Sequence, residues 1–290
     1  MLDEVRTGNS VLTFCMGRIE LKPINHFVDV IIFNMQLVTV QWNIGGGKVR
    51  TENSAVDVLA SYNSDGLAEI IELLRNLKPD IITLQEIHSD KKTNQAEIIA
   101  NALGLEYVIS DFYADSHIED GQSLGQAILS RFPITNHTFE LFFNPFYETI
   151  WEDGSKAISH DKGVTKCTVN VMGSSLDIKT LHLIPFRRFN IDPQSNDAGA
   201  VLDDVQHKLK NDSQSLLVQG DFNLDFSSLK AILPTFMQNM EEVIQNQPTT
   251  PNGRKLDHIV FRGLSLEKSS ALDSVLTDHY PVVTNFVIKD

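Results

Sequence analysis

The hydrophobic positions of this chain follow two rhythms, which together predict alternating strands and helices from residue 37 onward. Residues 37–42 and 80–84 are short runs rich in β-formers and other apolar side chains, as in buried strands. Between them, apolar residues recur at helical spacing from Leu67 to Leu77, and Pro79 ends this helix. The readable part of the chain therefore begins with a strand, a helix and a second strand.

The same rhythms continue toward the C-terminus. They predict helices over residues 95–103 and 197–210, a hairpin of residues 163–171 and 175–182, and strands that begin at Ala127 or cover residues 215–219, 256–262 and 281–288. The stretch from Pro133 to about Asp161 is aromatic and irregular in pattern. Its aromatic residues fit either a lid over a site or part of the core.

Residues 1–34 carry two short apolar patches without a clear rhythm. We interpret them as an N-terminal extension of unassigned structure, followed by one domain over residues 35–290. Hairpin strands mixed with helices indicate a layered α/β (α+β) protein with largely antiparallel pairing, and a purely parallel Rossmann sheet fits less well. We find no internal repeat, and the triplet at residues 45–47 matches neither a dinucleotide fingerprint nor a Walker loop.

Composition and charge narrow the range of partners. The 290 residues include 24 Lys and Arg against 38 Asp and Glu, a formal net charge of −14, which disfavours tight nonspecific binding to duplex nucleic acid. The two cysteines, Cys15 and Cys167, form no CxxC pair, so neither a disulfide framework nor a thiolate zinc site is predicted. No apolar run approaches the roughly 18 residues of a membrane span. We expect a cytoplasmic monomer.

Polar residues stand where the apolar strands stop. They are Asn43, Glu86, His182, Asp221, Asn223, Asp257, Asp278 and His279. Each has an ordinary alternative explanation as a turn former, a solvated acid or an interior histidine. Their joint placement favours one cleft at the end of the sheets. Asp221 and Asn223 are two apart, so in an extended chain they point to the same side.

Several short blocks give this pattern a family. They are Gln41-Trp42-Asn43, Leu84-Gln85-Glu86, Gly125-Gln126-Ala127-Ile128-Leu129-Ser130-Arg131, Thr180-Leu181-His182-Leu183, Gly220-Asp221-Phe222-Asn223, Lys255-Leu256-Asp257 and Thr277-Asp278-His279-Tyr280-Pro281-Val282. In identity and order they resemble the signature blocks of the endonuclease/exonuclease/phosphatase superfamily of metal-dependent phosphohydrolases, over residues 37–288.

The resemblance implies a fold and a set of roles. The fold would be a four-layer αββα sandwich, in which two mixed, mostly antiparallel sheets pack face to face with helices outside. Mg²⁺ or Mn²⁺ would be held by Glu86, with Asn43 and Asp278 nearby. In the catalytic set, Asp221 would activate water, Asn223 and His182 would contact the phosphate, and His279 would stabilise the transition state while Asp257 orients its ring.

Elementary chemistry leads to a similar picture. Four acids in one cleft would raise one another's pKa unless a cation lies between them. Carboxylate and amide oxygens suit Mg²⁺ or Mn²⁺ better than zinc. Protonated imidazoles at His182 and His279 would donate to phosphoryl oxygens, and the carboxylate of Asp221 would serve as a general base.

Other cationic groups are harder to assign. Arg187 and Arg188 fit a clamp on a phosphate of the substrate and a solvated surface loop equally well. We expect His88, His160 and His258 on the surface or opposite the site.

The substrate class follows only in outline. We expect a phosphodiesterase or phosphatase acting on a small or end-exposed phosphate ester. A DNA or RNA nuclease of the same superfamily is the alternative, although abasic-site endonucleases of this kind carry a tyrosine where His182 stands. A catalytically inactive binding module is a third interpretation. A hydrolase of carbon esters is disfavoured, because neither an HExxH nor a GxSxG element occurs.

Overall fold

The computed structural model describes residues 35–52, 54–55, 59–150, 154–274 and 276–288, and the backbone of two short strands nearer the N-terminus. These two strands, β1 (Glu4–Thr7) and β2 (Ser10–Thr13), pair antiparallel. The rest of the predicted extension lies outside the described residues.

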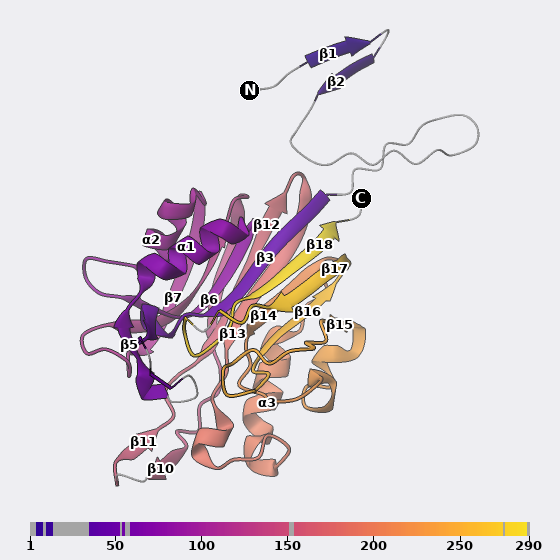
Figure 1. Ribbon diagram of the computed structural model, residues 1–290. Coiled ribbons are helices and arrows are strands. Elements are labelled where there is room, and N and C mark those ends of the chain that lie inside the picture. The colour runs from indigo at the N-terminus through magenta and orange to yellow at the C-terminus, as the bar shows by residue number, and fades with distance from the viewer. Residues whose placement is uncertain are drawn as a thin grey trace.

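Two six-stranded sheets dominate the molecule (Figure 1). Sheet 1 contains, from edge to edge, β17 (Leu264–Ala271), β18 (Val282–Ile288), β3 (Met35–Asn43), β6 (Ile81–Ser89), β8 (Ser123–Ser130) and β7 (Tyr107–Asp115). Sheet 2 contains β15 (Glu241–Glu242), β16 (Asp257–Arg262), β14 (Leu216–Asp221), β13 (Ser174–His182), β12 (Gly163–Val171) and β9 (Ile134–Leu141).

Each sheet has the same plan. The two central strands run parallel, β3 beside β6 in sheet 1 and β13 beside β14 in sheet 2, and every other pair is antiparallel. A helix lies between the parallel strands in sequence, α1 (Leu67–Leu77) in the first case and α3 (Asn196–Leu209) in the second. Each sheet is thus built around one strand–helix–strand unit.

Three apolar clusters hold the layers together. Val40 and Trp42 face α1 and α2 (Gln95–Leu103) on the outer side of sheet 1. Leu37, Ile178, Leu217 and Phe286 fill the space between the sheets. On the outer side of sheet 2, Leu181 and Val218 pack against Val201 and Val205 of α3. This order of layers confirms the predicted αββα sandwich.

Toward the cleft described below, the space between the sheets becomes polar. We call this layer the polar seam; its side chains are all fully buried: Thr39, Gln41, Thr83, Gln85, Gln126, Thr165, Thr180 and Gln219. Gln85 of sheet 1 donates to Thr180 of sheet 2 at 2.8 Å, and Gln219 of sheet 2 donates to Thr83 of sheet 1 at 2.9 Å. Buried amides and hydroxyls therefore find partners across the interface.

The prediction of an irregular stretch between Pro133 and Asp161 is wrong in part. It contains β9 and a small hairpin of β10 (Glu148–Ile150) and β11 (Lys156–Ile158), which projects from the lower end of the molecule in Figure 1. Of its aromatic residues, Phe142 is buried in the core, whereas Phe143 and Phe146 are exposed. Trp151 lies outside the described residues.

The remaining elements are short. They are β4 (Lys48–Arg50), β5 (Tyr62–Asp65) and the 3-10 helices η1 (Gly45–Gly47), η2 (Leu59–Ser61), η3 (Phe186–Phe189), η4 (Leu229–Ala231) and η5 (Phe236–Asn239). Across the described ranges, every helix is too short or too polar to cross a membrane.

Candidate active site

Four of the predicted residues stand where the pairing of the two parallel strand pairs ends, whereas Asn223 follows β14, Asp257 begins β16, and Asp278 and His279 precede β18. Asn43 is the last residue of β3, and Glu86 lies one position beyond its neighbour Gln85 in β6. In sheet 2, His182 ends β13 and Asp221 ends β14, and the two are directly paired. Ligand sites collect where parallel strands end, and here two such ends face each other across the sandwich.

Irregular backbone aims two of these side chains. The pairing of β6 with β8 is interrupted between Gln85 and Ile87, and Glu86 has a φ of +54°. In a regular strand Glu86 would point away from the face of Gln85. The bulge instead lets its carboxylate reach the cleft, and strained positions of this kind cluster at functional sites.

Asn223 is also strained, with a φ of +51°. The expectation that Asp221 and Asn223 share one side of an extended chain is therefore wrong in its reason. They meet because the Asn223 backbone N–H donates to Asp221 Oδ1 at 2.9 Å. The Asn223 Nδ2 donates to the Leu183 carbonyl at 2.9 Å, which fixes the orientation of the amide.

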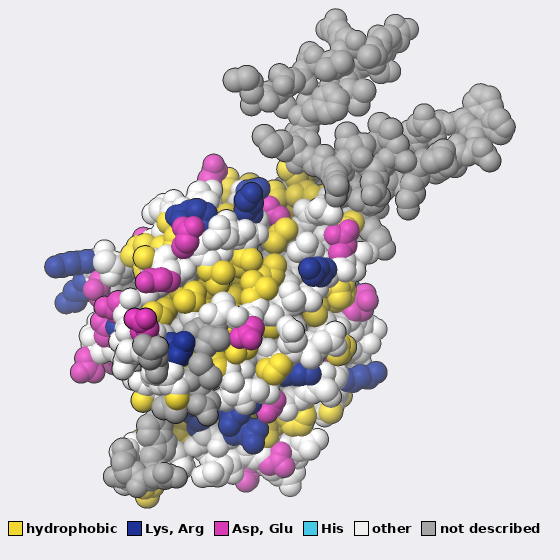
Figure 2. All heavy atoms as spheres, in the orientation of Figure 1, with side chains coloured by type: hydrophobic (Ala, Val, Ile, Leu, Met, Phe, Trp, Pro, Cys, Tyr) yellow, Lys and Arg dark blue, Asp and Glu magenta, His cyan; other side chains and the backbone are white. Residues whose placement is uncertain are grey.

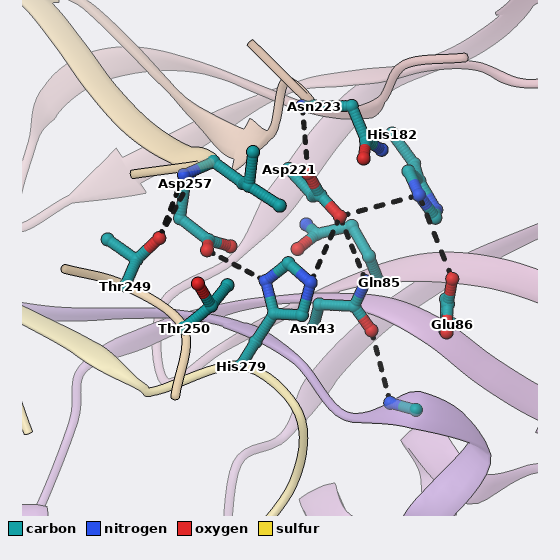
Figure 3. A network of polar contacts seen from close by, with 12 residues as sticks. Asn43, Gln85, Glu86, His182, Asp221, Asn223, Thr249, Thr250, Asp257 and His279 are labelled. Atoms are coloured by element: carbon teal, nitrogen blue, oxygen red, sulfur yellow. Dashed lines mark hydrogen bonds and ion pairs between the residues drawn. The ribbon is translucent and has the colours of Figure 1, made fainter. Parts of the chain in front are cut away.

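Five side chains form a continuous row in the cleft (Figure 3). Glu86 Oε1 lies 3.8 Å from His182 Nε2, which lies 3.4 Å from Asp221 Oδ2. Asp221 Oδ2 lies 3.6 Å from His279 Nε2, and His279 Nδ1 contacts Asp257 Oδ2 at 2.8 Å. Asn43 Nδ2 donates to Asp221 at 3.0 Å. The structure thus brings together residues separated by most of the sequence.

The two histidines of the row differ in charge. Burial lowers the pKa of His279, but the carboxylates of Asp257 and Asp221 outweigh it and hold this pKa well above 6.5. Burial and the charge of Lys162 push the pKa of His182 well below 6.5. These directions favour the protonated form of His279 and the neutral form of His182, which is opposite to the expectation of a protonated His182.

The carboxyl group of Asp221 has a pKa shifted toward neutral pH. Burial raises its pKa to about 6; the charge of His279 lowers it and that of Asp257 raises it. A general base works best with a pKa near the operating pH. A carboxyl group with this pKa, 3.4 Å from His182 and 3.6 Å from His279, can exchange a proton near neutral pH.

Two of the predicted metal ligands, Asn43 and Asp278, lie beside Gly45. The Asn43 Oδ1 accepts from the Gly45 N–H at 3.1 Å, and a Cβ on Gly45 would stand 3.3 Å from Asp278 Oδ1. Burial and the charge of Glu86 raise the pKa of Asp278. A divalent cation between the two carboxylates would relieve this repulsion, so the oxygen donors fit Mg²⁺ or Mn²⁺. Within the described segments, no group of three or more His, Cys, Asp or Glu residues forms a metal site by itself.

The cleft has a volume of about 620 Å³, and cationic and aromatic groups line its other wall. Both candidate arginines reach it. Arg187 pairs with Asp225 at 3.2 Å. Burial raises the pKa of Glu86, but the charges of Lys162, His117 and Arg188 outweigh it and lower this pKa, so Arg188 is one of several cations that act on Glu86.

Three further residues at the cleft, Lys162, Tyr113 and His117, were not predicted from the sequence. The hairpin of β12 and β13 held a signal for Lys162, because Gly163 pairs with His182 and the preceding residue must lie beside the strand end. Tyr113 contacts His182 Nδ1 at 3.1 Å from the edge strand β7, and His117 lines the cleft. Neither has a comparable signal in the pattern.

Three other histidines were expected on the surface or opposite the site; this is wrong for His160, and His88 and His258 are buried rather than on the surface. His160 lines the cleft, where burial and the charge of Lys162 lower its pKa to about 4. His88 is buried against Ser116, and His258 is buried between Glu242 and the Leu224 carbonyl.

The fold and cleft define a class of αββα proteins whose site lies at the ends of two facing sheets. A sequence model of the Endonuclease/Exonuclease/phosphatase family matches residues 40–279, and the chain belongs to this family. A relative from Vibrio cholerae, a UPF0294 protein, is 32% identical over 119 residues, which cover 39% of this chain and 41% of that protein. The match therefore spans about two-fifths of the relative's length.

Solved structures share the fold at low identity. An endonuclease/exonuclease/phosphatase from Beutenbergia cavernae is 18% identical, with a TM-score of 0.64 over 88% of this chain and 72% of that chain. A humanized D. rerio TDP2 is 15% identical, with a TM-score of 0.57 over 87% and 98%. A mannosyl-6-phosphatase from Bacteroides thetaiotaomicron is 17% identical, with a TM-score of 0.54 over 87% and 100%.

Proposed function

We propose that this protein is a Mg²⁺- or Mn²⁺-dependent hydrolase that acts as a phosphodiesterase or phosphatase on a small or end-exposed phosphate ester. The proposal also includes that the protein is a monomer located in the cytoplasm. The observation that carries it is the row of Glu86, His182, Asp221 and His279, which lines one cleft beside the predicted metal ligands, with Asp257 buried behind His279.

Each residue of the row has a chemical role in this proposal. Asp221 accepts a proton from the attacking water, and the protonated His279 donates to a phosphoryl oxygen as charge develops. The neutral His182 and the amide of Asn223 orient the phosphate. The divalent cation, held by Glu86, Asp278 and Asn43, polarises the phosphoryl group when bound.

A small or end-exposed substrate fits the surface better than a long duplex. On the face shown in Figure 2, Lys and Arg side chains stand in small groups among Asp and Glu rather than in one stripe. With a net charge of −14, the molecule repels long polyanions except where local cations act, as they do in the cleft.

The alternatives differ in what they require of the cleft. An inactive binding module has no need of a strongly shifted carboxyl–imidazole row, which supports catalysis. A nuclease would use the same row, so only the substrate separates it from the proposal.

One assay panel tests the proposal. Purified protein is incubated with Mg²⁺, Mn²⁺ or EDTA and with bis-p-nitrophenyl phosphate, p-nitrophenyl phosphate, single-stranded DNA, duplex DNA, RNA, sphingomyelin or a carboxyl ester. We expect metal-dependent, EDTA-sensitive cleavage of phosphate esters. Asp221→Ala and His279→Ala should each lower turnover at least about a hundredfold, the low end for a positioned acid or base.

The panel also contains the contrary outcomes. Cleavage of the carboxyl ester alone would overturn the reaction class, and a preference for internal bonds of duplex DNA would favour the nuclease. Near-normal turnover in both folded variants would remove the assigned roles.

A further inference from the structure

A buried lysine with no assigned role in the proposed reaction, Lys162, lines the cleft. Lys162 immediately precedes β12, and its side chain is only 3% exposed. Its Nζ lies 2.9 Å and 3.1 Å from the two ring nitrogens of His182 and 5.4 Å from the ring centroid of Tyr113. These contacts place the ammonium group against the row of side chains that the proposed reaction uses.

The ammonium group of Lys162 has no ion-pair partner in the part of the chain that the structure describes. The described Asp and Glu oxygens all lie more than 4.0 Å from its Nζ. Burying a charge without a partner is costly, and burial accordingly lowers the pKa of Lys162 to about 8 although Glu86 and Asp221 raise it. An imidazole can accept one of its three N–H groups, which leaves donors over.

A second lysine shows what a structural role looks like in this protein. Lys179 is also 3% exposed, and burial likewise lowers its pKa to about 8. Its Nζ, however, donates to three carbonyls at the end of α3, those of Lys208, Leu209 and Lys210. Lys179 is thus fully partnered by the fold, whereas the spare donors of Lys162 lie in the cleft.

The surroundings of Lys162 suit an anion. The positive charge of Arg188 acts on Lys162 as well as on Glu86 and Asp278, so both cations belong to one region of the cleft. His117 and His160 lie beside each other on the same lining, with ring centroids 5.2 Å apart. Together, Lys162, Arg188 and the two imidazoles offer N–H donors to an anion bound in the cleft.

We propose that Lys162 is a phosphate-binding catalytic residue, whose ammonium group donates hydrogen bonds to a phosphoryl oxygen of the substrate beside His182. This inference rests on the proposed function and extends it, because it supplies a second cationic contact for the phosphate, beside His182. The bound phosphate is the partner that the fold itself does not provide.

The test uses the full chain, with inorganic phosphate as the probe. Binding is measured by titration calorimetry at constant ionic strength, with Mg²⁺ and with EDTA, for the wild type, Lys162→Met, Lys162→Arg and the matched control Lys179→Met. Loss of a charge-assisted hydrogen bond should weaken phosphate binding by Lys162→Met at least about tenfold. Lys162→Arg should retain more affinity than Lys162→Met, and Lys179→Met should bind as the wild type does.

Thermal unfolding without phosphate separates this role from a merely structural one. Removing an unpartnered buried charge should leave the midpoint of Lys162→Met equal to or above that of the wild type, while Lys179→Met unfolds at a lower temperature. Unchanged phosphate affinity in Lys162→Met, or a clearly lowered midpoint, would overturn the proposal. If the wild type cleaves phosphate esters and Lys162→Met is equally active, the role of Lys162 is wrong but the proposed function stands. If the wild type neither binds phosphate nor cleaves phosphate esters, the role of Lys162 and the proposed function are both wrong.

Discussion

The charge of a side chain in this cleft is set by its neighbours rather than by its residue type. His279 and His182 stand on either side of Asp221, yet the first is held protonated by Asp257 and the second is kept neutral by burial and Lys162. The sequence predicted which residues meet, because each stands at the end of an apolar strand. It could not predict their protonation, because the pKa of each imidazole depends on how closely Asp257 and Lys162 approach it, and the pattern of apolar and polar positions does not specify those distances.

The pairing of Asp257 with His279 makes a prediction about pH. Asp257 raises the pKa of His279, so His279 loses its proton only well above pH 6.5 in the wild type. In Asp257→Asn that pKa falls, and the alkaline limb of the pH profile of kcat/KM should move to lower pH. At pH 8 the variant should be at least about tenfold slower.

Steady-state kinetics between pH 5 and pH 10 on the best substrate of the panel measures this shift. Asp212→Asn, at an exposed position, is the control and should keep the wild-type profile. An alkaline limb in Asp257→Asn that coincides with that of the wild type would show that the charge of His279 does not depend on Asp257.

Central strands were predictable from the sequence and edge strands were not. In β14, Leu216 and Val218 pack toward α3 while Leu217 packs between the sheets, so the strand reads as a continuous apolar run. The edge strands β7, β9 and β17 each have a face that is only partly covered, and β9 is largely exposed. They therefore lack both the apolar run and a clean alternation, and they were missed.

The end of α3 depends on a lysine from the neighbouring strand. Lys179 in β13 donates to the carbonyls of Lys208, Leu209 and Lys210, groups that the helix itself leaves without partners. Lys179→Met should lower the free energy of unfolding by about 1–3 kcal/mol, the penalty for leaving buried polar groups unsatisfied. Urea denaturation followed by circular dichroism measures it.

The matched variant for this measurement is Lys230→Met, because Lys230 is exposed. Its free energy of unfolding should stay within about 0.5 kcal/mol of the wild type. Equal losses in the two variants would mean that the carbonyls at the end of α3 find other partners.

At the scale of the whole molecule, the same plan appears twice. Each sheet centres on a parallel pair joined through a helix, and the residues from Asn43 to Asp221 stand at the ends of those pairs. The sequence shows no internal repeat, because strand direction and order arise from pairing rather than from similar side chains. Periodicity alone predicted only a layered α/β protein. The four-layer sandwich was predicted from the resemblance to the family.

The domain boundary at Met35 remains a prediction that truncation tests. Both sheets and all three apolar clusters are built from residues 35–288. A chain of residues 35–290 should therefore unfold in one cooperative transition, with a midpoint within about 4 °C of that of the full chain. Differential scanning calorimetry measures both, and aggregation or a broad transition in the shorter chain would place the boundary elsewhere.

The polar seam has a consequence for how the site keeps its shape. Apolar contacts between two sheets have no directional requirement, whereas the energy of a hydrogen bond depends steeply on distance and direction. His182 and Asp221 belong to one sheet, and Asn43 and Glu86 belong to the other. A relative displacement of the two sheets would therefore change the distances between these four side chains. The hydrogen bonds that Gln85 and Gln219 donate across the interface resist such a displacement of the sheets.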